Sequence, residues 1–208
     1  MKKEENLVGK LFEGCMTIPN LLSVIRIILV PFFAYFFLKG DKILAISILA
    51  FSGITDFLDG KIARRFNQVS ALGKVLDPVA DKITMLTIAV MMIILFGRAQ
   101  SPVIRAAGYV FIVFIVKELI FVIGGALMIG FGIRPGAAEI WGKIATFVFY
   151  LVMIAILLIG PEVGAFSTIM PETVAMILVC VSALCTIIAF ISYLPAIVKQ
   201  VRERFSKD

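Results

Sequence analysis

The amino-acid sequence predicts an all-α integral membrane protein with six transmembrane helices. Its 208 residues are 61% hydrophobic and only 16% charged, and the mean hydropathy is +1.07, which is far from the values of soluble domains. A bilayer-spanning helix requires roughly 20 apolar residues. Stretches close to that length fall at residues 21–38, 43–59, 76–96, 103–130, 140–160 and 172–194. No internal repeat or linker separates them, so we expect residues 1–208 to form a single domain.

Residues 1–16 are predicted to form a short juxtamembrane helix that lies in the membrane interface, because apolar and charged side chains alternate there at helical spacing. The apolar set is Leu7, Val8, Leu11, Phe12 and Cys15, and the charged set is Lys3, Glu4, Glu5, Lys10 and Glu13. A frayed hydrophilic tail is the alternative. The first span carries Arg26 and is not followed by a small-residue cleavage site, so we expect no cleaved signal.

The orientation of the spans follows from the basic residues of the short connections. Of the 20 Lys and Arg residues, 14 fall at the two termini and in the loops after the second and fourth spans, whereas 4 fall in the opposite loops. Both termini, including a tail at residues 195–208, are therefore expected in the cytoplasm. The formal charge of +6 suits an anionic leaflet of the cell membrane, but this attraction is common to membrane proteins and says little about function. We expect membrane lipids and not nucleic acid as partners.

The sequence contains no histidine, which removes Ser-His and Cys-His nucleophile pairs and the common nitrogen-rich zinc sites. Its three cysteines, Cys15, Cys180 and Cys185, lack the spacing of metal ligands. Oxygen atoms are the remaining candidates for metal ligands.

Four aspartates stand out in the loop region that joins the second and third spans. Asp56 and Asp59 are three residues apart and Asp77 and Asp81 are four apart, so each pair projects from one face of its helix. Two helices joined by a short loop can bring these faces together in a four-carboxylate cluster. Such a cluster requires positive charge.

Two sources of this charge remain open at this point. One is a salt-bridged loop in which Arg64, Arg65 and Lys82 pair with the carboxylates. The other is a pair of divalent cations, Mg²⁺ or Mn²⁺, at roughly 3.5–4 Å from each other, the arrangement that promotes phosphoryl transfer.

Small residues lie next to the aspartates, at Gly60, Ala63 and Gly73. They either leave room for a bulky anionic substrate or serve as helix-packing contacts. Arg64 offers a planar guanidinium to phosphate. Pro78 either bends the third span so that Asp77 and Asp81 are directed inward, or is an ordinary kink without that effect.

The complete pattern Asp56-x2-Asp59-Gly60-x2-Ala63-Arg64-x8-Gly73-x3-Asp77-x3-Asp81 resembles the signature of the CDP-alcohol phosphotransferase family. The resemblance implies a six-helix membrane enzyme that moves a phosphatidyl or similar group from a CDP-linked donor to an alcohol, with release of CMP. It also implies that the four aspartates hold two Mg²⁺ or Mn²⁺ ions, that Asp81 is the general base, and that the enzyme is a homodimer. The residues implied for the donor are Pro19, Asn20, Gly60, Ala63, Arg64, Ser70 and Gly73. For Pro19 and Asn20, a helix start capped by Thr17 or Asn20 is the alternative.

The wider resemblance favours the branch that uses CDP-diacylglycerol and glycerol 3-phosphate, the phosphatidylglycerophosphate synthases. It rests on Ile18–Leu22 with Arg26, Val30–Phe33, Ala63–Asn67 and Leu76–Lys82. Candidate residues for the phosphate-bearing acceptor are Lys117, Arg134 and Lys143. Lys117–Glu118 stands where related synthases carry an Arg-Glu pair, and Lys117 paired only with Glu118 is the alternative.

Two other functions are alternatives to this one: cardiolipin synthesis and cation transport. The segment Ser70–Gly73 and the aromatic last span also resemble the cardiolipin synthases of the same family, whose acceptor is phosphatidylglycerol. From a different class, a cation transporter or channel could use buried carboxylates. Transport sites usually lie near the bilayer midplane within repeated folds, whereas these aspartates lie at the ends of spans.

Overall fold

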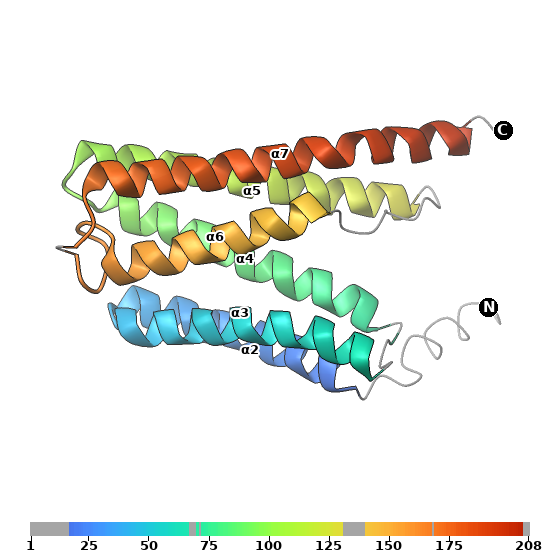
Figure 1. The fold of residues 1–208 in the computed structure, drawn as a ribbon, viewed down its shortest axis with the longest axis horizontal. Coiled ribbons are helices and arrows are strands. Elements are labelled where there is room, and N and C mark those ends of the chain that lie inside the picture. Colours follow the sequence, from blue (N-terminus) through green and yellow to red (C-terminus); the bar gives the residue numbers. More distant parts are fainter. Residues whose placement is uncertain (1–16, 67–69, 71, 131–139, 168, 206–208) are drawn as a thin grey trace. The chain divides into compact units, whose positions relative to one another are not determined.

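The computed structural model describes residues 17–66, 70, 72–130, 140–167 and 169–205, and at some helical positions, including Asp59, Gly60, Ala63 and Arg64, it describes the backbone alone. All regular elements within these ranges are helices (Figure 1). They are α2 (Ile18–Lys39), α3 (Lys42–Arg65), α4 (Gly73–Gly97), α5 (Pro102–Gly130), α6 (Ile140–Ile159) and α7 (Glu172–Phe205). The all-helical prediction is confirmed, since each expected span coincides with one helix. The interfacial helix expected at residues 1–16 lies outside the described residues.

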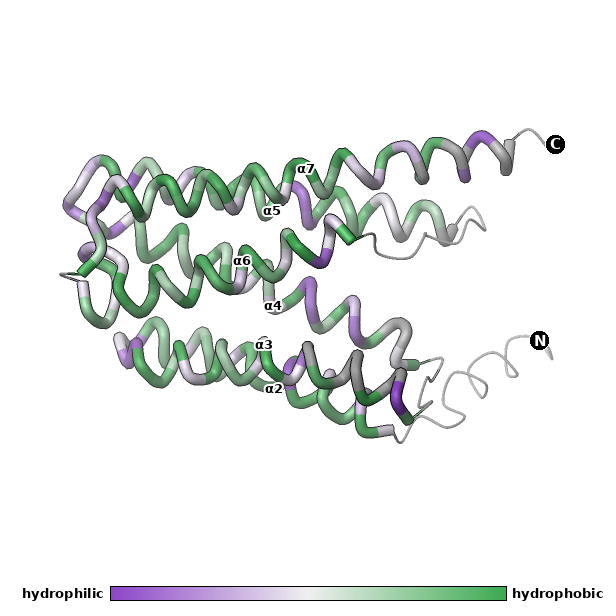
Figure 2. The backbone as a smooth tube through the Cα atoms, viewed as in Figure 1, coloured by the Kyte–Doolittle hydropathy of each residue, from purple (hydrophilic) through white to green (hydrophobic). Residues whose placement is uncertain are grey.

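Five of the helices are long and apolar enough to cross a membrane: α2, α6, residues 76–97 of α4, residues 102–125 of α5 and residues 172–195 of α7. Figure 2 shows hydrophobic residues along most of their length. Many of their large apolar side chains are exposed, including Leu21, Phe32, Phe147 and Ile177, as expected of helices whose outer faces meet lipid instead of water. The chain is therefore a multi-pass membrane protein.

Two helices extend beyond the apolar stretches that predict them. α3 continues past Asp59 to Arg65, and α7 continues past Leu194 to Phe205. Each apolar stretch ends where polar residues begin, but Lys, Arg, Gln and Glu are good helix formers. The helices therefore run on after the apolar pattern stops, and most of the tail expected at residues 195–208 is part of α7.

The helices form two compact units, residues 1–91 and residues 92–208. In the first unit α2 packs against α3, and a tight turn at Gly40 connects them. Gly40 has φ of +91°, a left-handed conformation that glycine adopts without steric cost, and its N–H caps α2 by donating to the carbonyls of Phe36 and Phe37. Because the turn reverses the chain, the end of α3 returns to the beginning of α2.

In the second unit α5 and α6 both pack against α7. Phe111 and Phe114 of α5 lie 5.7 Å apart between ring centroids, and Phe114 lies 4.8 Å from Phe149 of α6. These rings are at most 2% exposed, so they form the aromatic core of this unit. At its other end Gly142 of α6 lies against the Tyr193 hydroxyl, which a Cβ atom at this position would meet at 2.0 Å.

Candidate functional site

The first turn of α2 connects to the segment that precedes α4. Thr17 is the N-cap, since its hydroxyl accepts a 3.3 Å hydrogen bond from the Asn20 N–H. The Asn20 side chain is thereby left for a longer-range contact, and its Nδ2 donates to Ser70 Oγ over 2.9 Å. Ser70 Oγ also accepts the Gly73 N–H at 2.9 Å. Of the two caps considered for this helix, Thr17 is the one observed, and Asn20 instead bonds a residue that is 50 positions further along the chain.

Three polar residues of α2 recur at intervals of three within an otherwise apolar helix. They are Asn20, Ser23 and Arg26, with exposed fractions of 5%, 0% and 0%. Residues at this spacing lie along one side of a helix. We call this set the α2 polar ridge, and it faces the interior of the first unit.

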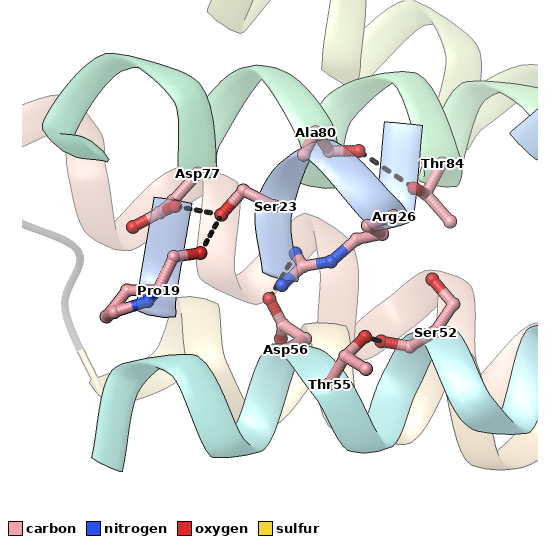
Figure 3. A network of polar contacts seen from close by, with 9 residues as sticks. All are labelled: Pro19, Ser23, Arg26, Ser52, Thr55, Asp56, Asp77, Ala80 and Thr84. Carbon is pink, nitrogen blue, oxygen red and sulfur yellow. Dashed lines mark hydrogen bonds and ion pairs between the residues drawn. The ribbon is translucent and has the colours of Figure 1, made fainter. Parts of the chain in front are cut away.

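Two members of the α2 polar ridge hold two of the predicted aspartates (Figure 3). Ser23 Oγ lies within hydrogen-bond distance of Asp77 Oδ1 of α4 and of the Pro19 carbonyl. Arg26 Nη1 donates to Asp56 Oδ1 of α3 and forms an ion pair with it. Carboxylates from two helices are thus held by donors from a third helix.

Each of these contacts uses one carboxylate oxygen. Asp56 and Asp77 are bound through Oδ1, and among the described residues the Oδ2 atom of each forms no hydrogen bond. The Asp56 side chain is 41% exposed although its partner Arg26 is fully buried. The positive charge beside Asp56 therefore comes from within α2.

The remaining two aspartates lie on α3 and α4. Asp81 lies one turn after Asp77 on α4 and is half-buried. Asp59 lies one turn after Asp56 on α3, and its side chain is not described. Among the residues that the structure does describe, no group of three or more acidic or cysteine side chains has the arrangement of a metal site. The chemistry of the donors nevertheless fits a hard divalent cation, which prefers carboxylate oxygens.

The other predicted site residues are distributed over both units. Gly60, Ala63 and Arg64 lie in the last turns of α3. In the second unit Lys117 forms an ion pair with the buried Glu118 of the same helix and lies 5.6 Å from the centroid of the Phe121 ring. Lys143 is exposed on α6, and Arg134 falls outside the described residues.

Neither Ser23 nor Arg26 is among the site residues predicted from the sequence. A signal for both was present, because two polar residues at helical spacing with Asn20 inside an apolar span are unusual. Their partners could not be read from this spacing, because Asp56 and Asp77 are 30 and 54 positions away.

Gly73 allows Asn20 and Ser70 to approach the start of α4. A Cβ atom at Gly73 would lie 2.4 Å from Asn20 Oδ1 and 3.0 Å from Ser70 Oγ. We expect Gly73→Ala to separate this buried pair and to cost about 1–3 kcal/mol of stability, the range for a buried polar group that loses its partner. Thermal unfolding in detergent measures the effect. Gly97→Ala is the matched control, since a Cβ atom there meets nothing within 4 Å, and an equal loss for both variants would contradict the expectation.

Carboxylates from α3 and α4 that are held against one side of α2 have the chemistry to bind divalent cations. The model of the family described as CDP-alcohol phosphatidyltransferase matches residues 16–189, which include the whole α2 polar ridge and all four aspartates. The chain belongs to this family, whose members are generally dependent on a divalent metal.

The relatives of this chain are named for two different enzymes. The chain is 31% identical to the CDP-diacylglycerol–glycerol-3-phosphate 3-phosphatidyltransferase of Aquifex aeolicus over 80% of this chain and 92% of that protein. It is 34% identical to a cardiolipin synthase (CMP-forming) of Streptomyces coelicolor over 65% of this chain and 62% of that protein. It is also 53% identical to a probable cardiolipin synthase of Drosophila melanogaster over 35% of this chain and 23% of that protein. The match thus spans under two thirds of both of these cardiolipin synthases.

Proposed function

We propose that this chain transfers the phosphatidyl group of CDP-diacylglycerol to the hydroxyl of an alcohol acceptor and releases CMP. In this reaction a bond forms between the acceptor oxygen and the phosphorus of the phosphatidyl group, and the bond from that phosphorus to CMP breaks. The observation that carries the proposal is the fixed placement of Asp56 and Asp77 by the α2 polar ridge, in a chain of the CDP-alcohol phosphatidyltransferase family.

Four aspartates would hold two Mg²⁺ or Mn²⁺ ions: Asp56, Asp59, Asp77 and Asp81. Such ions, when bound, neutralise the diphosphate and stabilise the charge on the departing CMP. Asp81 accepts the proton of the acceptor hydroxyl, a role that requires a carboxylate within about 3 Å of that oxygen. Arg64 binds a phosphate of the donor through its guanidinium.

The donor-binding residues divide into those that touch the donor and those that shape its site. Gly60 and Ala63 provide room for the cytidine diphosphate beside Asp59. Ser70 and Asn20 form a hydrogen bond with each other at the start of α4. Together with Pro19 and Gly73, they line one side of the nucleotide-binding site.

Glycerol 3-phosphate is the first candidate acceptor. The Aquifex aeolicus relative, which aligns with 80% of this chain and 92% of its own length, is named for glycerol 3-phosphate. Lys117, Arg134 and Lys143 would bind the phosphate of this acceptor, because a small doubly charged group requires several cations.

Phosphatidylglycerol is the second candidate acceptor, and one observation in the structure favours it. Lys117 already pairs with Glu118 and lies over the Phe121 ring, which neutralises a cation that glycerol 3-phosphate would need. Phe121 also stacks edge-on against Phe190 and Tyr193, an aromatic environment suited to a lipid acceptor.

The protein is proposed to act as a homodimer and single catalytic domain in the cell membrane, with both termini and the aspartates on the cytoplasmic side. The excess of Lys and Arg in the connections assigned to that side supports this orientation.

A panel of acceptors tests the function and separates the two candidates. Purified protein in detergent receives CDP-diacylglycerol and Mg²⁺ with glycerol 3-phosphate, phosphatidylglycerol, inositol 1-phosphate or serine, and CMP release is measured. We expect CMP with one phosphate-bearing alcohol and none without an acceptor. Product with phosphatidylglycerol alone assigns cardiolipin synthesis. If proteoliposomes show ion flux and no acceptor leads to CMP release, the proposal that the protein is an enzyme is wrong.

A further inference from the structure

We propose that Ser23 and Arg26 are positioning residues, which orient Asp77 and Asp56 so that the Oδ2 atom of each is presented to a divalent cation. This inference rests on the proposed function and extends it to two residues that touch no substrate. Its basis is the α2 polar ridge, from which one donor reaches an aspartate of α3 and another reaches an aspartate of α4.

Burial makes the two donors effective at fixing the carboxylates. Ser23 and Arg26 are both 0% exposed, so packing restricts their side chains to few conformations. Because each donor binds Oδ1, the χ1 and χ2 angles of the aspartate are constrained, and Oδ2 is the oxygen left to meet a cation. Ligands whose second oxygen is held by the protein lose less conformational entropy when they bind a metal.

Removing the charge of Arg26 distinguishes a positioning role from a purely electrostatic role, because the two roles predict opposite changes in metal affinity. A guanidinium always carries its proton, and a positive charge next to Asp56 repels a divalent cation by Coulomb's law. If Arg26 acted through charge alone, its neutralisation would strengthen metal binding. If it acts by orienting Asp56, its neutralisation weakens metal binding, in spite of the lower repulsion.

Ser23 provides a test that is free of charge effects. Its hydroxyl is neutral and small, so Ser23→Ala removes the contact to Asp77 and leaves every charge in place. Ser23→Thr keeps the hydroxyl and is the conservative variant that should restore binding. Loss of an outer contact to a metal ligand typically lowers metal affinity about 10–100-fold.

The experiment is a Mn²⁺ titration of the full-length protein in detergent, followed by electron paramagnetic resonance of free Mn²⁺ and without any lipid substrate. We expect Ser23→Ala and Arg26→Gln each to weaken Mn²⁺ binding about 10–100-fold, and Ser23→Thr to bind as the wild type does. Matched controls are Ser47→Ala, whose exposed hydroxyl bonds only the Ile43 carbonyl among the described residues, and Arg105→Gln, which neutralises an exposed arginine. Both should bind as the wild type does.

The possible failures are distinguishable. Wild-type affinity in a folded Ser23→Ala variant overturns the inference and leaves the proposed function intact. Tighter Mn²⁺ binding by Arg26→Gln assigns Arg26 a charge role and also overturns it. If Arg26→Gln does not fold, Ser23→Ala still decides the result. If the wild type itself binds no Mn²⁺, with or without CDP-diacylglycerol, the metal assignment of the proposed function fails, and the inference fails with it.

Discussion

Asp56→Asn is expected to abolish CMP release and to destabilise the folded protein at the same time. Asparagine cannot balance the charge of Arg26, which is fully buried. Loss of one partner from a fully buried ion pair costs roughly 3–5 kcal/mol. Because the Asp56 side chain is 41% exposed, water screens part of the interaction, and we expect a cost of about 1–3 kcal/mol.

The two effects of Asp56→Asn are measured separately, by CMP release from CDP-diacylglycerol with Mg²⁺ and by thermal unfolding in detergent. The matched control is Asp41→Asn. Asp41 pairs with Lys39 at 3.6 Å, but both side chains are about half exposed, so the loss should be under about 1 kcal/mol and CMP release should persist. Normal turnover by a folded Asp56→Asn variant would remove Asp56 from the proposed site.

Asp81→Asn is expected to retain metal binding and to lose turnover. Asparagine is nearly isosteric with aspartate and can still offer one oxygen to a cation, but it cannot accept the proton of the acceptor hydroxyl. General-base catalysis typically contributes about 10²–10⁴-fold to a rate, so kcat should fall by about that factor, with a much smaller change in the Mn²⁺ concentration needed for half-maximal rate.

Asp77→Asn is the informative comparison for Asp81→Asn, since Asp77 lies one turn earlier on the same helix. It is proposed to bind metal without accepting a proton, so Asp77→Asn should lower turnover only by weakening Mn²⁺ binding, and saturating Mn²⁺ should restore much of the rate. Titration of Mn²⁺ against both variants, with activity measured at each concentration, separates the two roles. Equal losses of Mn²⁺ binding would show that Asp81 acts chiefly as a metal ligand and not as the base.

Much of the fold was predictable because the bilayer acts as a simple solvent. A helix satisfies its own backbone hydrogen bonds, so long apolar stretches in a membrane protein become helices, and all six expected spans correspond to helices. The predicted helix ends were less accurate, because hydropathy marks where an apolar stretch stops and not where the helix stops. Polar helix formers carry α3 to Arg65 and α7 to Phe205.

The candidate site was predictable where the signal is local. Aspartates three and four residues apart share a face of one helix, and their spacing together with Gly60, Ala63 and Arg64 is visible in the sequence alone. Thr17 was one of two caps considered for the first span, and it proved to be the cap.

The sequence by itself thus determined the all-helical fold, the position of each helix, the chemical type of the candidate ligands and the family. Only the tertiary structure decided which residues meet: Arg26 pairs with Asp56, Ser23 lies at Asp77, and Asn20 bonds Ser70. The physical reason is that periodicity reports which side of a helix a residue occupies, but not which other helix that side meets. That choice depends on how α2, α3 and α4 pack, because contacts between residues 30–54 positions apart arise only when the helices come together.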